Sequence, residues 1–131
     1  MITKKIEILG KEVTLAYCYA TEIAYKDLSG EELPLFIAGA VNNLANNRMP
    51  DIKQSLFAII ASMMPVYQTA DEAPIKDTDL MNDADPREIG TAIGTLINIY
   101  AEFYHIPKDE PEDKPATGSS PAKKRKKSKN A

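Results

Sequence analysis

Large apolar side chains stop at Pro107, and this limits what the chain can fold into. Residues 108–131, KDEPEDKPATGSSPAKKRKKSKNA, contain no aromatic and no branched apolar residue. Such a segment buries too little apolar surface to offset the conformational entropy that it would lose on ordering. The sequence therefore predicts a single globular domain at residues 1–106 and a disordered basic tail at residues 107–131.

The net charge of the chain changes sign at the same place, from negative before Pro107 to positive after it. Residues 1–106 hold 8 Lys/Arg against 15 Asp/Glu, whereas residues 107–131 hold 8 against 4, and the whole chain has a net charge of −3. An acidic body repels phosphates, which disfavours a nucleic-acid groove in the folded part. We expect the basic end of the tail to bind polyanions weakly and without sequence preference, through Lys123, Lys124, Arg125, Lys126, Lys127 and Lys129.

The N-terminal segment alternates apolar and polar residues, which is typical of a β-hairpin at about residues 2–19. The apolar positions are Ile2, Ile6, Ile8, Val13, Leu15 and Tyr17. Gly10-Lys11 fits a two-residue turn whose first position needs a positive φ. Lys4 interrupts the alternation, which indicates a frayed end or a sheet edge.

Helical spacing of apolar residues takes over from Ala20. It predicts helices at about 21–28, 32–46, 51–66 and 86–105, with one helical turn inside the polar connection at 78–81. Ser29 is the expected N-cap of the second helix, and Pro65 should kink or end the third. The expected buried positions of these two helices are Leu33, Ile37, Ala40, Val41, Leu44, Ile52, Leu56, Ile59, Ile60, Met63 and Tyr67, with Phe57 and Met64 widening the second stripe.

Asp85-Pro86-Arg87-Glu88 is the clearest helix start, with an N-cap, a proline at the first helical position and an acid at the third. We expect Ile93 and Leu96 to be buried at the centre of the following stripe. Gly90 and Gly94 should let another backbone approach closely. The predicted fold class is mainly α (α+β), with an N-terminal β-hairpin packed on a small helical bundle.

Residues that could carry chemistry are few. The single cysteine, Cys18, is expected to be a small buried hydrophobe, and the single histidine, His105, to lie exposed near a helix C-terminus. Four acidic residues lack the glycine and the closing glutamate of a calcium loop, and fit a solvated connection with helix caps; they are Asp77, Asp79, Asp83 and Asp85. The sequence predicts no enzyme, no metal site and no cofactor.

The tyrosines and the apolar stretches indicate which kinds of partner the protein can have. The six tyrosines lie mostly on apolar stripes, where core packing or a protein interface explains them more simply than base stacking; they are Tyr17, Tyr19, Tyr25, Tyr67, Tyr100 and Tyr104. LFAIIASMMPVY is too short to span a bilayer, and the N-terminus does not resemble a signal peptide. We expect a cytoplasmic protein with no membrane partner.

The arrangement of segments resembles the tail assembly chaperones of long-tailed bacteriophages and prophages. The resemblance runs over about residues 5–107, through IEILGKEVTLAY, ATEIAYKDLSGEEL and IKDTDLMNDADPREIGTAIGTLINIYAEFYHIP, followed by a charged low-complexity end. It implies a small, helical, non-enzymatic protein made in the infected bacterium. Such chaperones coat the tape-measure protein and keep it soluble until tail-tube subunits polymerise around it.

The resemblance also implies the partners, namely the tape-measure protein and, as a second candidate, the tail-tube subunit. It points to no individual partner-binding residue, and self-association stays open. Two alternatives remain at this point. One is a small nucleic-acid-associated protein that uses its basic tail, and the other is an unrelated adaptor subunit of a mobile element.

Overall fold

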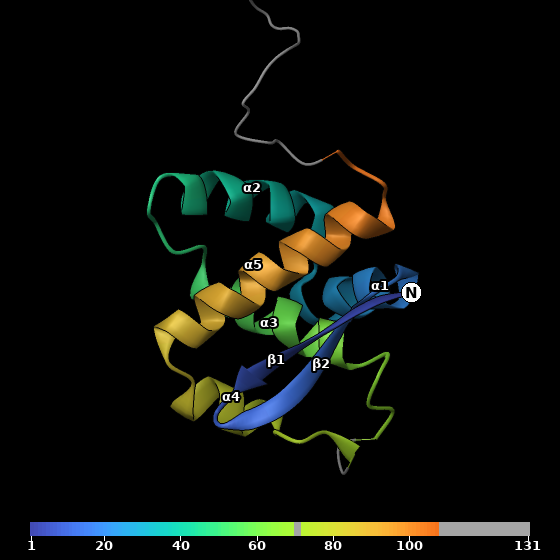
Figure 1. Cartoon of the computed structure of the whole chain (residues 1–131), viewed down its shortest axis with the longest axis vertical. Coiled ribbons are helices and arrows are strands. Elements are labelled where there is room, and N and C mark those ends of the chain that lie inside the picture. The colour runs from blue at the N-terminus through green and yellow to red at the C-terminus, as the bar shows by residue number, and fades with distance from the viewer. Residues whose placement is uncertain (70–71, 108–131) are drawn as a thin grey trace, which may run out of the picture.

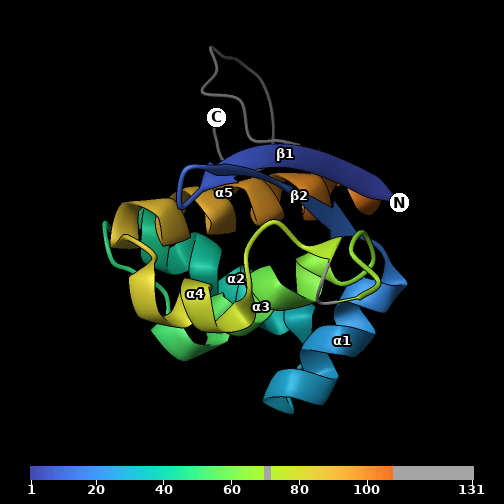
Figure 2. The same ribbon diagram turned by 90° about the horizontal axis from the view of Figure 1, so that it is seen from below.

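The computed structural model describes residues 1–69 and 72–107. Its elements in chain order are β1 (Ile2–Ile8), β2 (Lys11–Tyr17), α1 (Tyr19–Ser29), α2 (Leu33–Ala45), α3 (Ile52–Met63), α4 (Asp77–Asp83) and α5 (Pro86–Phe103). β1 and β2 form an antiparallel hairpin that packs on α5, and β2 also packs on α3 (Figures 1 and 2). The predicted fold class is confirmed. The tail predicted to be disordered lies outside the described residues.

The hairpin turn lies one residue earlier than predicted. Ile8 pairs with Lys11, so the turn residues are Leu9 and Gly10, with φ of 55° and 75°. Two positive φ values are the requirement of a type I′ turn, the form that matches strand twist. This register buries Ile8 completely. A leucine with positive φ is unfavourable by itself, and it is held here by a hydrogen bond from its amide to Oε2 of Glu88, at 2.9 Å.

Ser29 does not cap α2, contrary to the prediction. It is the last residue of α1, where its hydroxyl donates to the carbonyl of Tyr25 at 2.8 Å. Gly30 then ends that helix in the left-handed conformation, at φ 80°. The N-cap position of α2 falls on Glu32, and Pro34 lies in the first turn as predicted.

The start of α5 is confirmed. Asp85 accepts from the amide of Arg87 at 2.7 Å, and Oε1 of Glu88 accepts from the amide of Asp85 at 3.1 Å, so each carboxylate caps the helix. α3 ends at Met63, two residues before Pro65, in agreement with the expected stop. The helical turn predicted at 78–81 is the longer helix α4.

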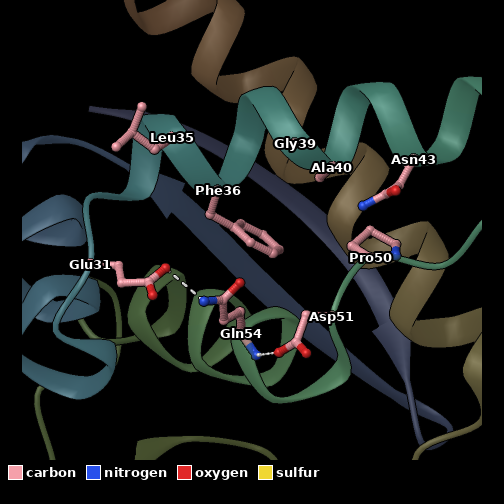
Figure 3. A pocket seen from close by; sticks show the side chains of 9 residues that line it. All are labelled: Glu31, Leu35, Phe36, Gly39, Ala40, Asn43, Pro50, Asp51 and Gln54. Carbon is pink, nitrogen blue, oxygen red and sulfur yellow. Dashed lines mark hydrogen bonds between the residues drawn. The ribbon is translucent and has the colours of Figure 1, made fainter.

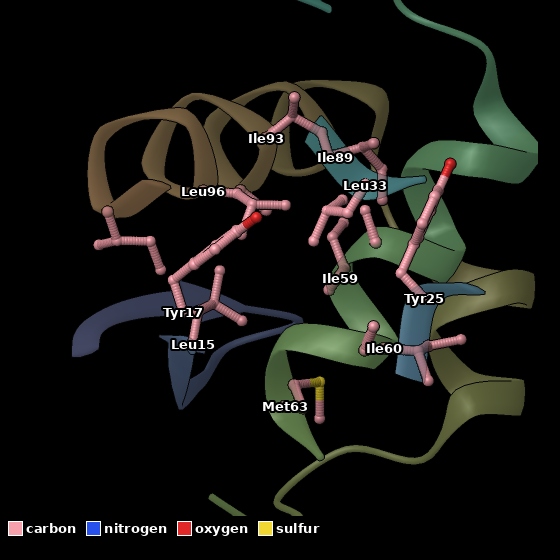
Figure 4. Packing of buried hydrophobic residues seen from close by; sticks show 14 of the residues in the cluster. Leu15, Tyr17, Tyr25, Leu33, Ile59, Ile60, Met63, Ile89, Ile93 and Leu96 are labelled. Atoms are coloured by element: carbon pink, nitrogen blue, oxygen red, sulfur yellow. The ribbon is translucent and has the colours of Figure 1, made fainter. Parts of the chain in front are cut away.

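One apolar core joins the hairpin to the helices (Figure 4). Ile93 and Leu96 have no exposed surface, as predicted. Three other expected core positions are exposed instead, namely Val41, Ile52 and Met64. The buried stripes of α2 and α3 are therefore narrower than their apolar spacing indicates. α2 lies at the periphery and packs mainly on α1 and α5.

The glycines of α5 do not serve the predicted purpose. A side chain built on Gly90 would meet only Sδ of Met49, at 3.8 Å, and one on Gly94 would meet nothing within 4 Å. No backbone in the described residues approaches either position closely. The Gly-xxx-Gly spacing is thus no evidence of close helix packing in this fold.

Candidate protein-interaction surface

An apolar groove of about 360 Å³ lies between α2 and α5, which cross at an angle and approach each other toward the start of α2 and the end of α5 (Figure 1). We call it the α2/α5 groove; its lining residues are Pro34, Ile37, Ala38, Val41, Ile97, Tyr100, Ala101 and Ile106. Val41 is 47% exposed and Ile106 is 43% exposed, so two branched apolar side chains on its walls face solvent. Apolar surface of this kind gains free energy when a partner covers it.

The end of α5 places Ile106 in this groove. His105 has φ 55°, and the amides of His105 and Ile106 donate back to the carbonyls of Glu102 and Ala101, at 3.2 and 2.8 Å. This pair of bonds is a Schellman motif with a histidine at the left-handed position. His105 is exposed, as predicted. Its function in the fold is to turn the chain so that Ile106 returns toward α5.

An aromatic cluster continues the apolar surface beyond the groove. Its rings come from the end of β2, the start of α1 and the end of α5; they are Tyr17, Tyr19, Tyr100, Phe103 and Tyr104, with neighbouring centroids 5.0–6.1 Å apart. Tyr100 belongs to both the cluster and the groove. Tyr19 is 64% exposed and lies one helical turn before Ile23, which is 63% exposed. The prediction that tyrosines serve packing or an interface is thus consistent with where these rings lie.

One carboxylate ties the cluster together. Oε2 of Glu22 accepts a hydrogen bond from the hydroxyl of Tyr17 at 2.6 Å and from the hydroxyl of Tyr104 at 2.5 Å. Burial, together with this bond to Glu22, raises the pKa of Tyr17 far above its ordinary value. The hydrogen bond to Glu22, with smaller effects from desolvation and from the charge of Glu22, raises the pKa of Tyr104 to about 12. Glu22 thereby joins the start of α1 to the end of α5.

This arrangement predicts a pH dependence. Both tyrosines have raised pKa values in the folded state, so they stabilise the fold fully below pH 10.0, and the part due to Tyr104 is lost as pH rises to about 12. The free energy of unfolding should therefore fall across this window, less steeply in Tyr104→Phe. Ultraviolet titration of tyrosinate checks the assignment, and simultaneous ionisation of all tyrosines near pH 10 would contradict it.

A second pocket, of about 190 Å³, lies between α2 and α3 (Figure 3). Its polar groups already bind each other. Nε2 of Gln54 donates to Oε1 of Glu31 at 2.6 Å, and the amide of Gln54 donates to Oδ2 of Asp51 at 3.0 Å. Among the described residues, the lining side chains of the α2/α5 groove form no such hydrogen bonds with each other, which makes the groove the better candidate for an apolar partner.

The other residues singled out from the sequence within the described part of the chain, namely Cys18 and the four aspartates, form no binding site there. Cys18 is half-buried, contrary to the prediction, because it caps α1 where the chain leaves β2; its Sγ lies 3.8 Å from Oγ1 of Thr21. Asp79 and Asp85 cap helices, as predicted. In residues 1–69 and 72–107, His, Cys, Asp and Glu side chains nowhere gather in a group that could hold a metal ion. The basic tail residues 123–129 lie outside the described residues.

Among the helices of the described ranges, none is both long and apolar enough to cross a membrane. No family model, no curated protein and no solved structure matches this chain.

Sequence reasoning missed the α2/α5 groove. Its walls come from two helices about 60 residues apart, and the apolar spacing of α2 predicts that Val41 is buried, whereas it is exposed. One signal could have found it. The stripe of α2 contains more apolar residues than a peripheral helix can bury, so some of them had to face solvent or a partner.

Proposed function

We propose that this protein is a tail assembly chaperone, which binds amphipathic helical segments of a tape-measure protein and keeps them soluble until the tail tube polymerises around them. The observation that carries the proposal is the open apolar α2/α5 groove. An amphipathic client helix would lay its apolar face on Val41 and Ile106, in the helix-in-groove mode. The resemblance of the sequence to tail assembly chaperones is what names the client.

The shape and chemistry of the surface favour a long apolar client. The groove continues through Tyr100 into the aromatic cluster, whose rings offer large contact area at little cost in side-chain entropy. Each apolar side chain covered there contributes about 25 cal/mol per Å² of buried surface. A client several turns long could therefore bind without any deep pocket.

Charge suits the same task. Residues 1–106 carry 15 acidic against 8 basic residues, so clients coated by the folded domain repel one another and the assemblies stay dispersed. The same charge works against a nucleic-acid partner for the folded part, because phosphates are repelled too. The described residues favour the chaperone over a nucleic-acid-associated protein.

Co-expression with the tape-measure protein tests the proposal. The tape-measure protein should stay in the soluble fraction with the wild-type chain, and also with a chain that ends at Pro107. Val41→Asp should weaken capture by on the order of tenfold or more, because the client would bury a carboxylate. Leu35→Asp is the matched control, since Leu35 is 72% exposed on the same helix but lies at the α2/α3 pocket.

Two outcomes would contradict the proposal. If the tape-measure protein precipitates equally with and without this chain, the chaperone function is wrong. If capture occurs but Leu35→Asp abolishes it while Val41→Asp does not, the chaperone function stands and the α2/α5 groove is not the client site. Circular dichroism of both variants confirms that each is folded.

A further inference from the structure

The two edges of the hairpin differ in how their backbone groups are satisfied. On β2, the amide of Thr14 points away from β1 and donates to the hydroxyl of Tyr67, at 3.0 Å. Since hydrogen-bonding direction alternates along a strand, the register places the outward backbone groups of β1 at Thr3, Lys5 and Glu7. Within the described part of the chain, these three residues make no hydrogen bond on that side. β1 is therefore a seven-residue edge strand that is ready to pair.

Side chains along β1 specify which strand fits this edge. Thr3, Lys5 and Glu7 are all exposed and point to the outer face of the hairpin. In an antiparallel pair of two β1 strands centred on Ile6, Lys5 of each copy lies opposite Glu7 of the other. Registers centred on Lys4, Lys5 or Glu7 would instead place two like charges opposite each other. Opposite charges stabilise a cross-strand pair and like charges destabilise it, so the register centred on Ile6 is favoured.

We propose that β1 pairs with β1 of a second copy, antiparallel about a two-fold axis at Ile6, and so joins two hairpins into one four-stranded sheet. Figure 2 shows β1 along the upper margin of the molecule, where a second hairpin can approach. Such an interface is isologous, because the same residues contribute from both sides. Two Lys5–Glu7 ion pairs and one contact between the two Ile6 side chains form its centre.

The charges inside the hairpin support the same partner. Glu7 lies directly opposite Glu12 on the outer face, so two carboxylates repel each other across the strands. The ion pairs found in the described ranges, Lys26–Glu32 and Arg87–Asp85, leave both glutamates without a basic partner. Lys5 of a second copy would lie beside Glu7 and offset this repulsion. Pairing thereby weakens an unfavourable interaction that the single copy keeps in full.

Lys5 also explains why a second copy is favoured over an unrelated peptide. Lysine on an edge strand normally discourages pairing, because its charge is left without a partner. β1 of a second copy supplies an acid opposite each Lys5, and a strand without an acid at that position does not. The charges along β1 therefore favour pairing with another β1 strand.

Charge exchange tests the proposal on the full chain. Sedimentation velocity at ~150 mM salt should show a concentration-dependent dimer. Lys5→Glu and Glu7→Lys each place like charges opposite each other and should weaken dimerisation by on the order of tenfold. The double variant, with both changes, restores opposite charges and should recover the wild-type affinity. Lys11→Glu makes the same charge change as Lys5→Glu on β2 and should have little effect.

Cysteine cross-linking tests the register. With Cys18→Ser as background, Ile6→Cys should form a disulfide-linked dimer on mild oxidation, because directly opposed residues of this pair lie about 4.5 Å apart between Cα atoms, within disulfide reach. Lys4→Cys should not, since residue 4 lies opposite Ile8 of the second copy. Any of four results would overturn the proposal. The wild-type chain could stay monomeric, or the single charge variants could dimerise as well as wild type. The double variant could fail to recover dimerisation, or residues 4 and 6 could cross-link equally.

Discussion

Replacing Leu96 with alanine is expected to lower the free energy of unfolding by about 2–4 kcal/mol. Leu96 is fully buried in α5, where Figure 4 shows it facing Tyr17 and Leu15 of the hairpin. The smaller side chain loses burial and leaves a cavity that the rigid helix cannot fill by shifting. A domain of this size has a total stability of about 5–15 kcal/mol, so the loss is a large share.

Urea unfolding followed by circular dichroism measures the loss. Leu35→Ala is the matched control, since it makes the same change at a side chain that is 72% exposed in α2. It should change the free energy of unfolding by less than about 0.5 kcal/mol. Equal midpoints for the two variants would mean that α5 does not carry the core.

Local signals predicted the elements of this fold well. The start of α5 depends on residues within four positions of each other, Asp85 to Glu88, and the structure has the caps that the sequence indicates. The end of α3 follows from the ring of Pro65, whatever lies around it. Such features are determined by covalent geometry and by nearest neighbours. That is why a single sequence is enough to find them.

Contacts between distant residues could not be predicted in the same way. Tyr104 donates to Glu22 across 82 positions, and the α2/α5 groove needs both helices in place. The turn at Leu9 is a mixed case. Glycine at position 10 is a local signal, but the register also depends on the burial of Ile8 and on a carboxylate 79 positions away. Apolar spacing likewise overestimated burial at Val41, because it cannot tell a central helix from a peripheral one.

Replacing Glu88 with alanine is expected to cost about 2–3 kcal/mol, although Glu88 is a polar residue at the surface of the first turn of α5. Its Oε1 accepts from the amide of Asp85 and its Oε2 from the amide of Leu9, so one carboxylate both caps the helix and holds the hairpin turn. Its negative charge also lies at the positive end of the helix dipole. Alanine removes all three interactions and leaves the amide of Leu9 without this partner.

Two further variants separate these contributions. Glu88→Gln keeps the length of the side chain but has one accepting oxygen, so it should satisfy one of the two amides and lose less stability than alanine. Glu102→Ala removes an exposed carboxylate from the last turn of the same helix, where it opposes the dipole, and should cost nothing measurable. The order of stability should be wild type and Glu102→Ala, then Glu88→Gln, then Glu88→Ala.

Amide hydrogen exchange shows whether the hairpin turn is the part that loosens. The amide of Leu9 should be protected in the wild-type protein and should exchange much faster in Glu88→Ala, because its acceptor is gone. Glu88 makes no hydrogen bond to α3 in the described residues. In Glu88→Ala, the exchange rates of α3 amides should therefore rise only as much as the loss of global stability requires. If Leu9 exchanges at the same rate in both proteins, the turn holds its left-handed conformation without Glu88, and the bond across 79 positions adds no stability.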